Sequence, residues 1–245
     1  MERVKRELKK FSSKEKALFY PRFFKTGVGE YGHGDEFIGV TVPNCRVIAK
    51  KYACLGIGEV QKLLRSKVHE ERLIALLILV IQLKRTDLMG KTKVYNFYLK
   101  NTRHINNWDL VDLSADKIVG EYLYQNPNCT TTFQGQAFKG TKILIQLAKS
   151  KNLWERRVSI IATYYFIKEG EFDETLKISG ILLGDKEDLI HKAVGWMLRE
   201  AGKRNVQILK KFLKTNYQKL PRTALRYAIE RFPQALRKKY LRGDF

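Results

Sequence analysis

A short polar and aromatic stretch near the middle of the chain contains residue types that could do chemistry. In the sequence NNWDLVD, Trp108 and Asp112 are four positions apart, so a helix here would place both on one face. Leu110, Val111 and Leu113 are then expected to point elsewhere. An aromatic wall beside a carboxylate is a candidate catalytic site. The same spacing also fits a half-buried tryptophan with the aspartate in a structural hydrogen bond.

A second tryptophan and an arginine are further candidates in the C-terminal half. Trp196 follows Gly195 inside KAVGWMLRE. A glycine in a helix interior costs about 1 kcal/mol relative to alanine, so it usually allows another group to come close. Close packing between helices would explain this glycine equally well. Arg157 begins a predicted helix, where its guanidinium could bind a phosphate through two hydrogen bonds; a salt bridge with Glu155 or with a neighbouring helix is the alternative.

Other catalytic and metal-binding arrangements are not supported. The four histidines share no metal-ligand spacing, and no Ser/His/Asp order suggests a nucleophilic triad. The segment GQAFKGTK lacks the lysine that directly follows the second glycine of a phosphate-binding loop. Three cysteines without CxxC spacing fit a reducing compartment. We therefore expect no metal, no cofactor and a cytoplasmic location.

The elements that must position these residues are predicted to be helices. Helical periodicity or length is present in six segments: 71–84, 92–101, 141–150, 155–168, 188–203 and 222–232. Segment 37–42 has strand-forming residues but no second strand near enough to pair with it, and 126–140 is expected to be a long loop. The length of 245 residues and the absence of a Ser/Gly-rich linker predict one domain over 1–245.

Four of the predicted helices repeat one another. Segment 71–84 aligns with 155–168 without a gap, and each begins Glu-Arg and ends in Lys. Two further helices align with these two, so that Lys192 takes the aligned position of Arg157 and Arg226 that of Lys192. Such spacings are typical of stacked helical hairpins, whose inner helices line a concave surface. The predicted fold is an all-α, HEAT-like helical repeat solenoid with a concave basic face.

The charge of the chain points to a polyanionic partner. Lys and Arg number 47 against 25 Asp and Glu, a formal net charge of +22. This excess attracts nucleic acid first and an anionic membrane surface second. The longest apolar run, 73–83, is too short for a bilayer span of about 20 residues, so we expect no membrane partner.

Four motifs follow one another along the chain: NNWDLVD, NLWERR, KAVGWMLRE and LPRTALRYAIERF. In this order and spacing they resemble a known family, the AlkD-like DNA glycosylases, and the resemblance covers residue 37 to the C-terminus. It implies a HEAT-like solenoid around duplex DNA. Segment 126–140 is longer than the family pattern requires, and 22–37 matches poorly, so no DNA contact is transferred to 22–37.

The resemblance also implies roles for individual residues. Asp112 corresponds to the catalytic carboxylate, Trp108 and Trp196 to the tryptophans that flank the damaged nucleotide, and Arg157 to a phosphate-contacting arginine. Lys192 and Arg226, which align with Arg157 in the repeats, are expected to bind DNA as well.

The implied activity is removal of alkylated purines from DNA by a monofunctional glycosylase, the first step of base excision repair. Alkylation at N3 or N7 makes the purine a cationic leaving group, so the second carboxyl group that glycosidases use to protonate the leaving group is not needed. The expected enzyme is a monomer that acts on duplex DNA near the nucleoid.

Two alternatives stay open. The first is a non-catalytic HEAT-repeat protein that binds nucleic acid, since one branch of relatives has lost the Trp and Asp. All four positions are occupied here as in active members, which favours activity. The second is a HEAT-type protein–protein adaptor, which explains the repeats but neither WDLVD nor the net charge of +22.

Overall fold

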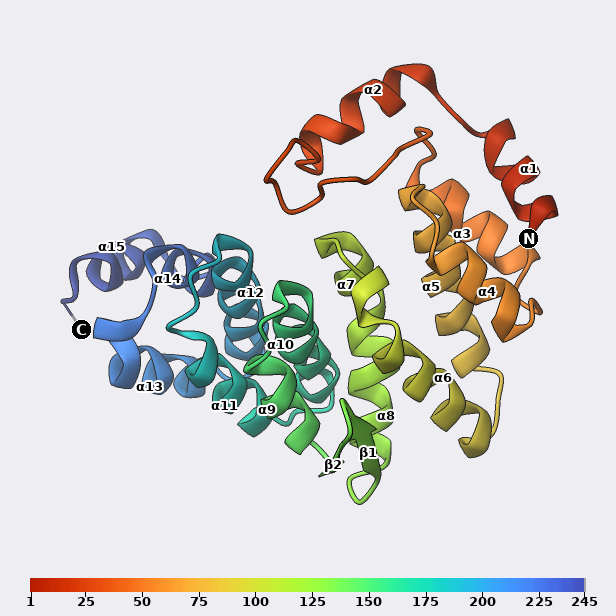
Figure 1. Cartoon of the computed structure of the whole chain (residues 1–245). Coiled ribbons are helices and arrows are strands. Elements are labelled where there is room, and N and C mark those ends of the chain that lie inside the picture. The colour runs from red at the N-terminus through yellow and green to blue at the C-terminus, as the bar shows by residue number, and fades with distance from the viewer. Residues whose placement is uncertain (245) are drawn as a thin grey trace. The chain divides into compact units, whose positions relative to one another are not determined.

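Helices dominate the computed structural model, which describes residues 1–244 (Figure 1). The all-α fold of helical repeats predicted from the sequence is confirmed. The chain forms two compact units, one from Met1 to Ser114 and one from Ala115 onward. A single domain over 1–245 stays a prediction. Within the described residues, no helix combines the length and the apolar character that a membrane crossing requires.

Unit 1 is built around one long buried helix, α5. Its helices are α1 (Glu2–Lys10), α2 (Lys14–Phe23), α3 (Val42–Lys51), α4 (Ile57–Leu64), α5 (His69–Leu83), α6 (Leu88–Lys100), the 3₁₀ turn η1 (Thr102–His104) and α7 (Trp108–Ala115). Helix α5 packs against α3, α4 and α6. Because its sequence LIALLIL is apolar on all sides, α5 can be covered on every face, which is what a helix at the centre of a core requires.

The segment before α3 is extended but forms no strand of a sheet. The carboxylate of Glu70, in the first turn of α5, accepts hydrogen bonds from the backbone N–H groups of Ile38, Gly39 and Val40. It thereby takes the place of a partner strand, because buried backbone donors must be satisfied. Helix α3 then begins at Val42. The strand-forming composition of 37–42 therefore leads to no sheet, as its isolation predicted.

Unit 2 arranges its helices in two rows (Figure 1). Its elements are the π-helical turn η2 (Asp116–Gly120), α8 (Glu121–Gln125), β1 (Thr130–Phe133), β2 (Gln136–Lys139), α9 (Lys142–Ala148), α10 (Leu153–Lys168), α11 (Asp173–Leu182), α12 (Asp188–Arg204), α13 (Val206–Asn216), the 3₁₀ turn η3 (Tyr217–Lys219), α14 (Arg222–Ala228) and α15 (Gln234–Arg242). One row contains α10, α12 and α14 in contact in that order, and α9 and α11 belong to the other row. Each hairpin thus buries its apolar side against the next one, as in a helical repeat.

The internal repeat is visible in matching hydrogen bonds. The guanidinium of Arg72 donates to the carbonyls of Ser66 and Lys67, at 2.9 and 3.2 Å. Arg156, 84 positions later, donates to the carbonyls at 150 and 151, both at 3.1 Å. Each arginine also pairs with an aspartate at 2.6 Å, Arg72 with Asp35 and Arg156 with Asp185. The two helix starts that align in the sequence therefore use the same arginine in the same way.

The expectation of a long loop over 126–140 is wrong, because this segment contains a β-hairpin. Strands β1 and β2 pair antiparallel with Thr130 opposite Lys139, and Phe133 opposite Gln136. Gln134 and Gly135 connect them with φ of 49° and 79°. Two consecutive residues with positive φ form the tight turn that suits a two-stranded ribbon. The two strands, TTTF and QAFK, are short and lack the apolar alternation by which a strand is recognised in sequence.

Gly195 serves close helix packing, one of the two interpretations of its position. A Cβ added there would lie 2.5 Å from both the carbonyl oxygen of Ala224 and the Cβ of Tyr227. Helices α12 and α14 therefore approach so closely that only glycine fits at the contact. Trp196, the next residue, is half-buried on α12.

Candidate active site

Trp108 and Asp112 line one pocket in unit 1. Helix α7 begins at Trp108, as the NNWDLVD pattern predicted, and the side chain of Asn107 accepts the N–H of Trp108 at 2.8 Å. The pocket has a volume of about 460 Å³. Its lining is formed by Phe19, Tyr20, Phe23, Phe24, Phe37, Val40, Val42, His69, Glu70, Leu73, Trp108, Asp109, Asp112 and Leu113. Leu113 lines it too, contrary to the expectation that it points elsewhere.

Aromatic rings fix the indole of Trp108. Phe24, just after α2, stacks on it with ring centroids 5.4 Å apart and planes 15° from parallel. Phe24 in turn stacks on Phe37 at 4.9 Å, and Phe37 stacks on the imidazole of His69 at 4.7 Å. Stacked rings restrict one another's rotation and each pair adds about 0.5–1.5 kcal/mol beyond the burial of area. The indole is therefore held in place before any ligand binds.

A buried network of charged side chains lies behind this wall. The ring nitrogens of His69 are 3.1 Å from Asp35 Oδ2 and 2.8 Å from Asp109 Oδ2. Arg72 lies 2.6 Å from the same Asp35 oxygen, and Asn107 donates to it at 3.3 Å. All five side chains are more than nine-tenths buried. Each ring nitrogen faces a carboxylate oxygen, an arrangement that favours the protonated imidazole because it can donate from both nitrogens.

The pKa values of the network agree with that geometry. Burial disfavours the imidazolium, but the charge and hydrogen bond of Asp109 and the hydrogen bond of Asp35 outweigh burial and raise the pKa of His69 from 6.5 to about 9. Burial would raise the pKa of Asp35, yet its hydrogen bond to His69 and the charge of Arg72 lower it below the usual value. Two positive and two negative charges therefore balance within the network.

Unit 2 contains the other predicted site residues. Trp196 lies on α12 with its ring 6.0 Å from that of Tyr164. Arg157, in the first turns of α10, is buried, and its guanidinium donates to the carbonyl oxygen of Leu189 at the start of α12. The structure therefore brings Trp108 and Asp112 together in unit 1, whereas Trp196 and Arg157 belong to unit 2.

The two remaining cations differ in their surroundings. Lys192 forms an ion pair with Asp188 at 2.8 Å one turn earlier on α12, and its hydrogen bond lowers the pKa of that carboxyl. Arg226 is exposed on α14. An exposed guanidinium is available to a phosphate without first breaking a buried contact.

Sequence reasoning missed the residues that support the site. The spacing of His69 fits no metal site, and Asp109 belongs to no pattern besides the one that Trp108 and Asp112 form. The partners of His69 lie 34 and 40 positions away along the chain, so no local pattern connects them. The one available signal is the run His-Glu-Glu-Arg at 69–72, four charged or polar residues that form the first turn of the otherwise apolar helix α5.

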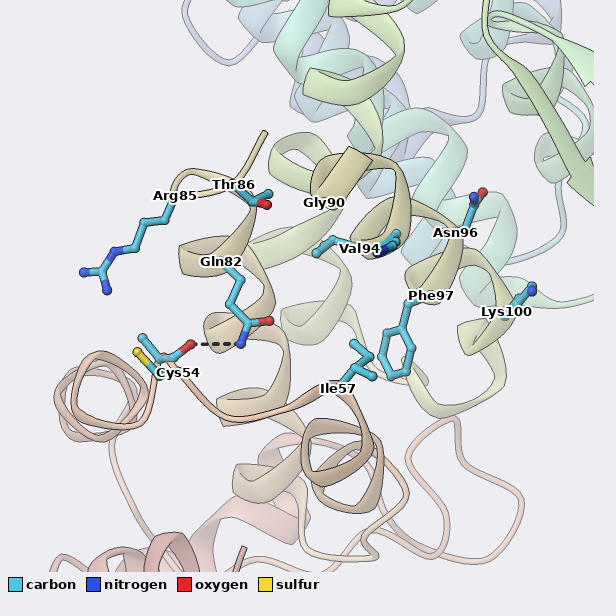
Figure 2. Close-up of a pocket in the computed structure, with 12 residues that line it drawn as sticks. Cys54, Ile57, Gln82, Arg85, Thr86, Gly90, Val94, Asn96, Phe97 and Lys100 are labelled. Atoms are coloured by element: carbon cyan, nitrogen blue, oxygen red, sulfur yellow. Dashed lines mark hydrogen bonds between the residues drawn. The ribbon is translucent and has the colours of Figure 1, made fainter. Parts of the chain in front are cut away.

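A second pocket in unit 1 does not have the features of an active site. It lies between the end of α3, α5 and α6, with a volume of about 740 Å³ (Figure 2). Its lining contains the cations Arg85, Lys93 and Lys100 but no carboxylate. Gln82 points into it and is held by the carbonyls of Ala53 and Leu55, both at 2.8 Å. In residues 1–244, no group of three or more His, Cys, Asp or Glu side chains is placed to hold a metal ion.

The fold and the pocket define an all-α repeat protein with a carboxylate among aromatic rings. Comparisons with known proteins identify its family and agree with its fold. The family model of the DNA alkylation repair enzymes matches residues 4–232. A solved structure, "Predicted DNA alkylation repair enzyme from Enterococcus faecalis", superposes with a TM-score of 0.65 at 17% identity, over 91% of this chain and 97% of that one. At this identity the likeness shows the fold alone. No curated protein matches the sequence. On the family match, this chain belongs to the DNA alkylation repair enzyme family.

Proposed function

We propose that this protein is a monofunctional DNA glycosylase that hydrolyses the N-glycosidic bond of N3- or N7-alkylated purines in duplex DNA. The observation that carries the proposal is the carboxylate of Asp112 in the same aromatic pocket as the indole of Trp108. The product, an abasic site, is the substrate of the next step of base excision repair. The enzyme acts as a monomer, without metal or cofactor.

The chemistry needs one carboxylate because the substrate base is cationic. When the C1′–N bond breaks, its electron pair neutralises the purine ring, so no proton is required on the leaving group. Asp112 stabilises the positive charge that develops on the sugar, and water adds its oxygen to C1′ and releases a proton. Asp112 is half-buried in a pocket lined mostly by apolar side chains, and electrostatic stabilisation is stronger where the local dielectric is lower.

The direct experiment is release of 7-methylguanine from methylated duplex DNA by the native chain. The proposal expects free base and an equal number of abasic sites. Binding of the duplex without base release would instead favour the non-catalytic nucleic-acid-binding alternative. Absence of both would favour the adaptor.

Trp108→Ala and Trp196→Ala should each weaken binding and excision of the lesion by about 1–3 kcal/mol. This is the range for contacts between aromatic side chains and bases. The measurement is binding and single-turnover excision with lesion-containing duplex, with thermal melting followed by circular dichroism. Trp154, only 7% exposed, provides the comparison: Trp154→Ala should lower the melting temperature as a core substitution does. Loss of cooperative melting in either site variant would show that its tryptophan belongs to the core.

Binding to any duplex should fall steeply with salt. The net charge of +22 and the repeated cations Arg157, Lys192 and Arg226 suggest about six neutralised phosphates, which gives a slope of about −5 for log K against log salt concentration. Arg157→Ala should reduce the steepness by about one unit and lower excision. Fluorescence anisotropy across a salt series measures this.

Because Arg157 is buried, its replacement could also destabilise unit 2, so exposed Arg226 gives the cleaner variant. Arg226→Ala should also flatten the slope by about one unit, with an unchanged melting temperature. A slope near zero for the native chain, or preference for single-stranded RNA, would contradict the duplex-binding proposal and its predicted concave basic face.

A further inference from the structure

Helix α2 exposes large apolar side chains to solvent beside the candidate active site. Leu18, Phe19 and Phe23 are 78, 58 and 51% exposed, and no residue of α2 is buried. Apolar side chains that gather on one exposed helix usually mark a surface that binds another molecule. An amphipathic helix usually buries its apolar face in the core of its own chain. These three side chains are exposed instead, so core packing does not explain them.

These rings are continuous with the wall that contains Trp108. Phe19 and Phe23, one helical turn apart, stack with centroids 6.2 Å apart and planes 22° from parallel. Phe23 meets the indole of Trp108 edge-on at 5.9 Å. Phe19, Phe23, Trp108 and Asp112 all line the same pocket. An aromatic surface therefore runs from the solvent face of α2 to the carboxylate.

The charge around these rings identifies the kind of partner. Segment 14–25 contains the cations Lys14, Lys16, Arg22 and Lys25 and a single acid, Glu15. The four cations are all exposed. Flat apolar rings among exposed cations fit a molecule with flat apolar faces and regularly spaced negative charges, which describes nucleic acid. A second copy of the chain fits poorly because two chains of net charge +22 repel each other.

We propose that Phe19 and Phe23 form a contact surface for duplex DNA that binds the nucleotides next to the one whose base is removed. Their rings pack against deoxyribose and base edges, and the neighbouring cations contact the phosphates. The pairing of rings with cations allows this surface to hold the duplex in register with Asp112 without reading its sequence. This inference rests on the proposed function, because it takes the pocket of Asp112 as the position of the target nucleotide.

The test compares Phe19→Ala/Phe23→Ala with a matched double variant, Leu88→Ala/Met89→Ala. Leu88 and Met89 are 58 and 63% exposed at the start of α6. Affinity for a duplex carrying a tetrahydrofuran abasic analogue, measured by fluorescence anisotropy, should fall at least about tenfold in the first variant. In the matched variant it should change less than about twofold. Melting temperatures of both should stay close to native, because the removed side chains are at least half exposed. Phe23→Tyr, which retains the ring, should keep near-native affinity.

The outcomes separate this inference from the proposed function. If the native chain releases base and the Phe19/Phe23 variant binds and cuts like native, the contact surface is overturned and the proposed function stands. If the native chain releases no base but its duplex binding depends on Phe19 and Phe23, the proposed function fails and the DNA contact is retained. If the variant abolishes a dimer seen by sedimentation and leaves DNA binding unchanged, the surface binds a second copy and the proposal is overturned.

Discussion

Asp112→Asn should lower base release about 10²–10³-fold while DNA binding persists. The substitution keeps the shape of the side chain and removes the charge that, under the proposed function, faces the developing cationic sugar. Loss of one preorganised electrostatic group of this kind costs about 3–4 kcal/mol of transition-state stabilisation. Asp112 is half-buried among aromatic rings, where charge is screened less than in water.

Single-turnover excision of 7-methylguanine, with enzyme in excess over duplex, measures the chemical step directly. The matched control is Asp87→Asn, an exposed residue whose side chain caps α6 by accepting the N–H of Gly90 at 2.9 Å. Asparagine caps a helix as well as aspartate does, so this variant changes the same charge without consequence for stability or excision. A reduction below about fivefold in Asp112→Asn would remove Asp112 from the catalytic role.

His69→Ala should lower the free energy of unfolding by about 3–5 kcal/mol, the largest stability effect that we expect. The imidazolium bridges Asp35 and Asp109, and its removal leaves two carboxylates buried with one cation, Arg72. Breaking a buried ion pair by removal of one partner is costly because the other charge stays desolvated. Denaturant unfolding measures the effect, and Asp87→Asn serves again as the control. A change below about 1 kcal/mol would show that the network contributes little to stability.

The same network predicts a pH dependence. The pKa of His69 is about 9 in the folded chain and 6.5 as the ordinary value, a difference equivalent to about 3 kcal/mol. This contribution is fully present below pH 6.5 and is lost as the pH rises through about 9. The pKa of Asp35 is lowered, so its contribution is present above its ordinary value of 3.8 and is lost as the pH falls below it. The network should therefore stabilise unit 1 most between about pH 4 and 6.5.

Unfolding free energies across pH 5–10 for the native chain and for His69→Gln test this dependence. Glutamine does not titrate, so the loss of stability between pH 6.5 and 9 should be smaller in the variant by about 3 kcal/mol. Equal pH profiles in the two proteins would contradict a protonated His69 in the folded chain.

Short-range patterns in the sequence were sufficient for the six helices expected from periodicity and for placing Trp108 and Asp112 on one helix face. The helix expected over 155–168 is α10, Leu153–Lys168, and the one expected over 188–203 is α12, Asp188–Arg204. Residues four apart on a helix share a face whatever surrounds them, so the Trp108/Asp112 face follows from spacing alone. The alignment of 71–84 with 155–168 is supported as well, because the same arginine contacts recur 84 positions apart.

Only the tertiary structure decided which distant groups meet. It placed Asp35 and Asp109 on either side of His69, covered Trp108 with Phe24, and buried the guanidinium of Arg157 against α12. These contacts join segments tens of residues apart, and their formation depends on the closure of intervening loops and on the packing of whole helices. Helical periodicity repeats every few residues, so it contains no information about which distant segments come into contact. The hairpin at 130–139 was missed for a related reason: its strands are stabilised by pairing with each other, a contact that neither four-residue sequence encodes by itself.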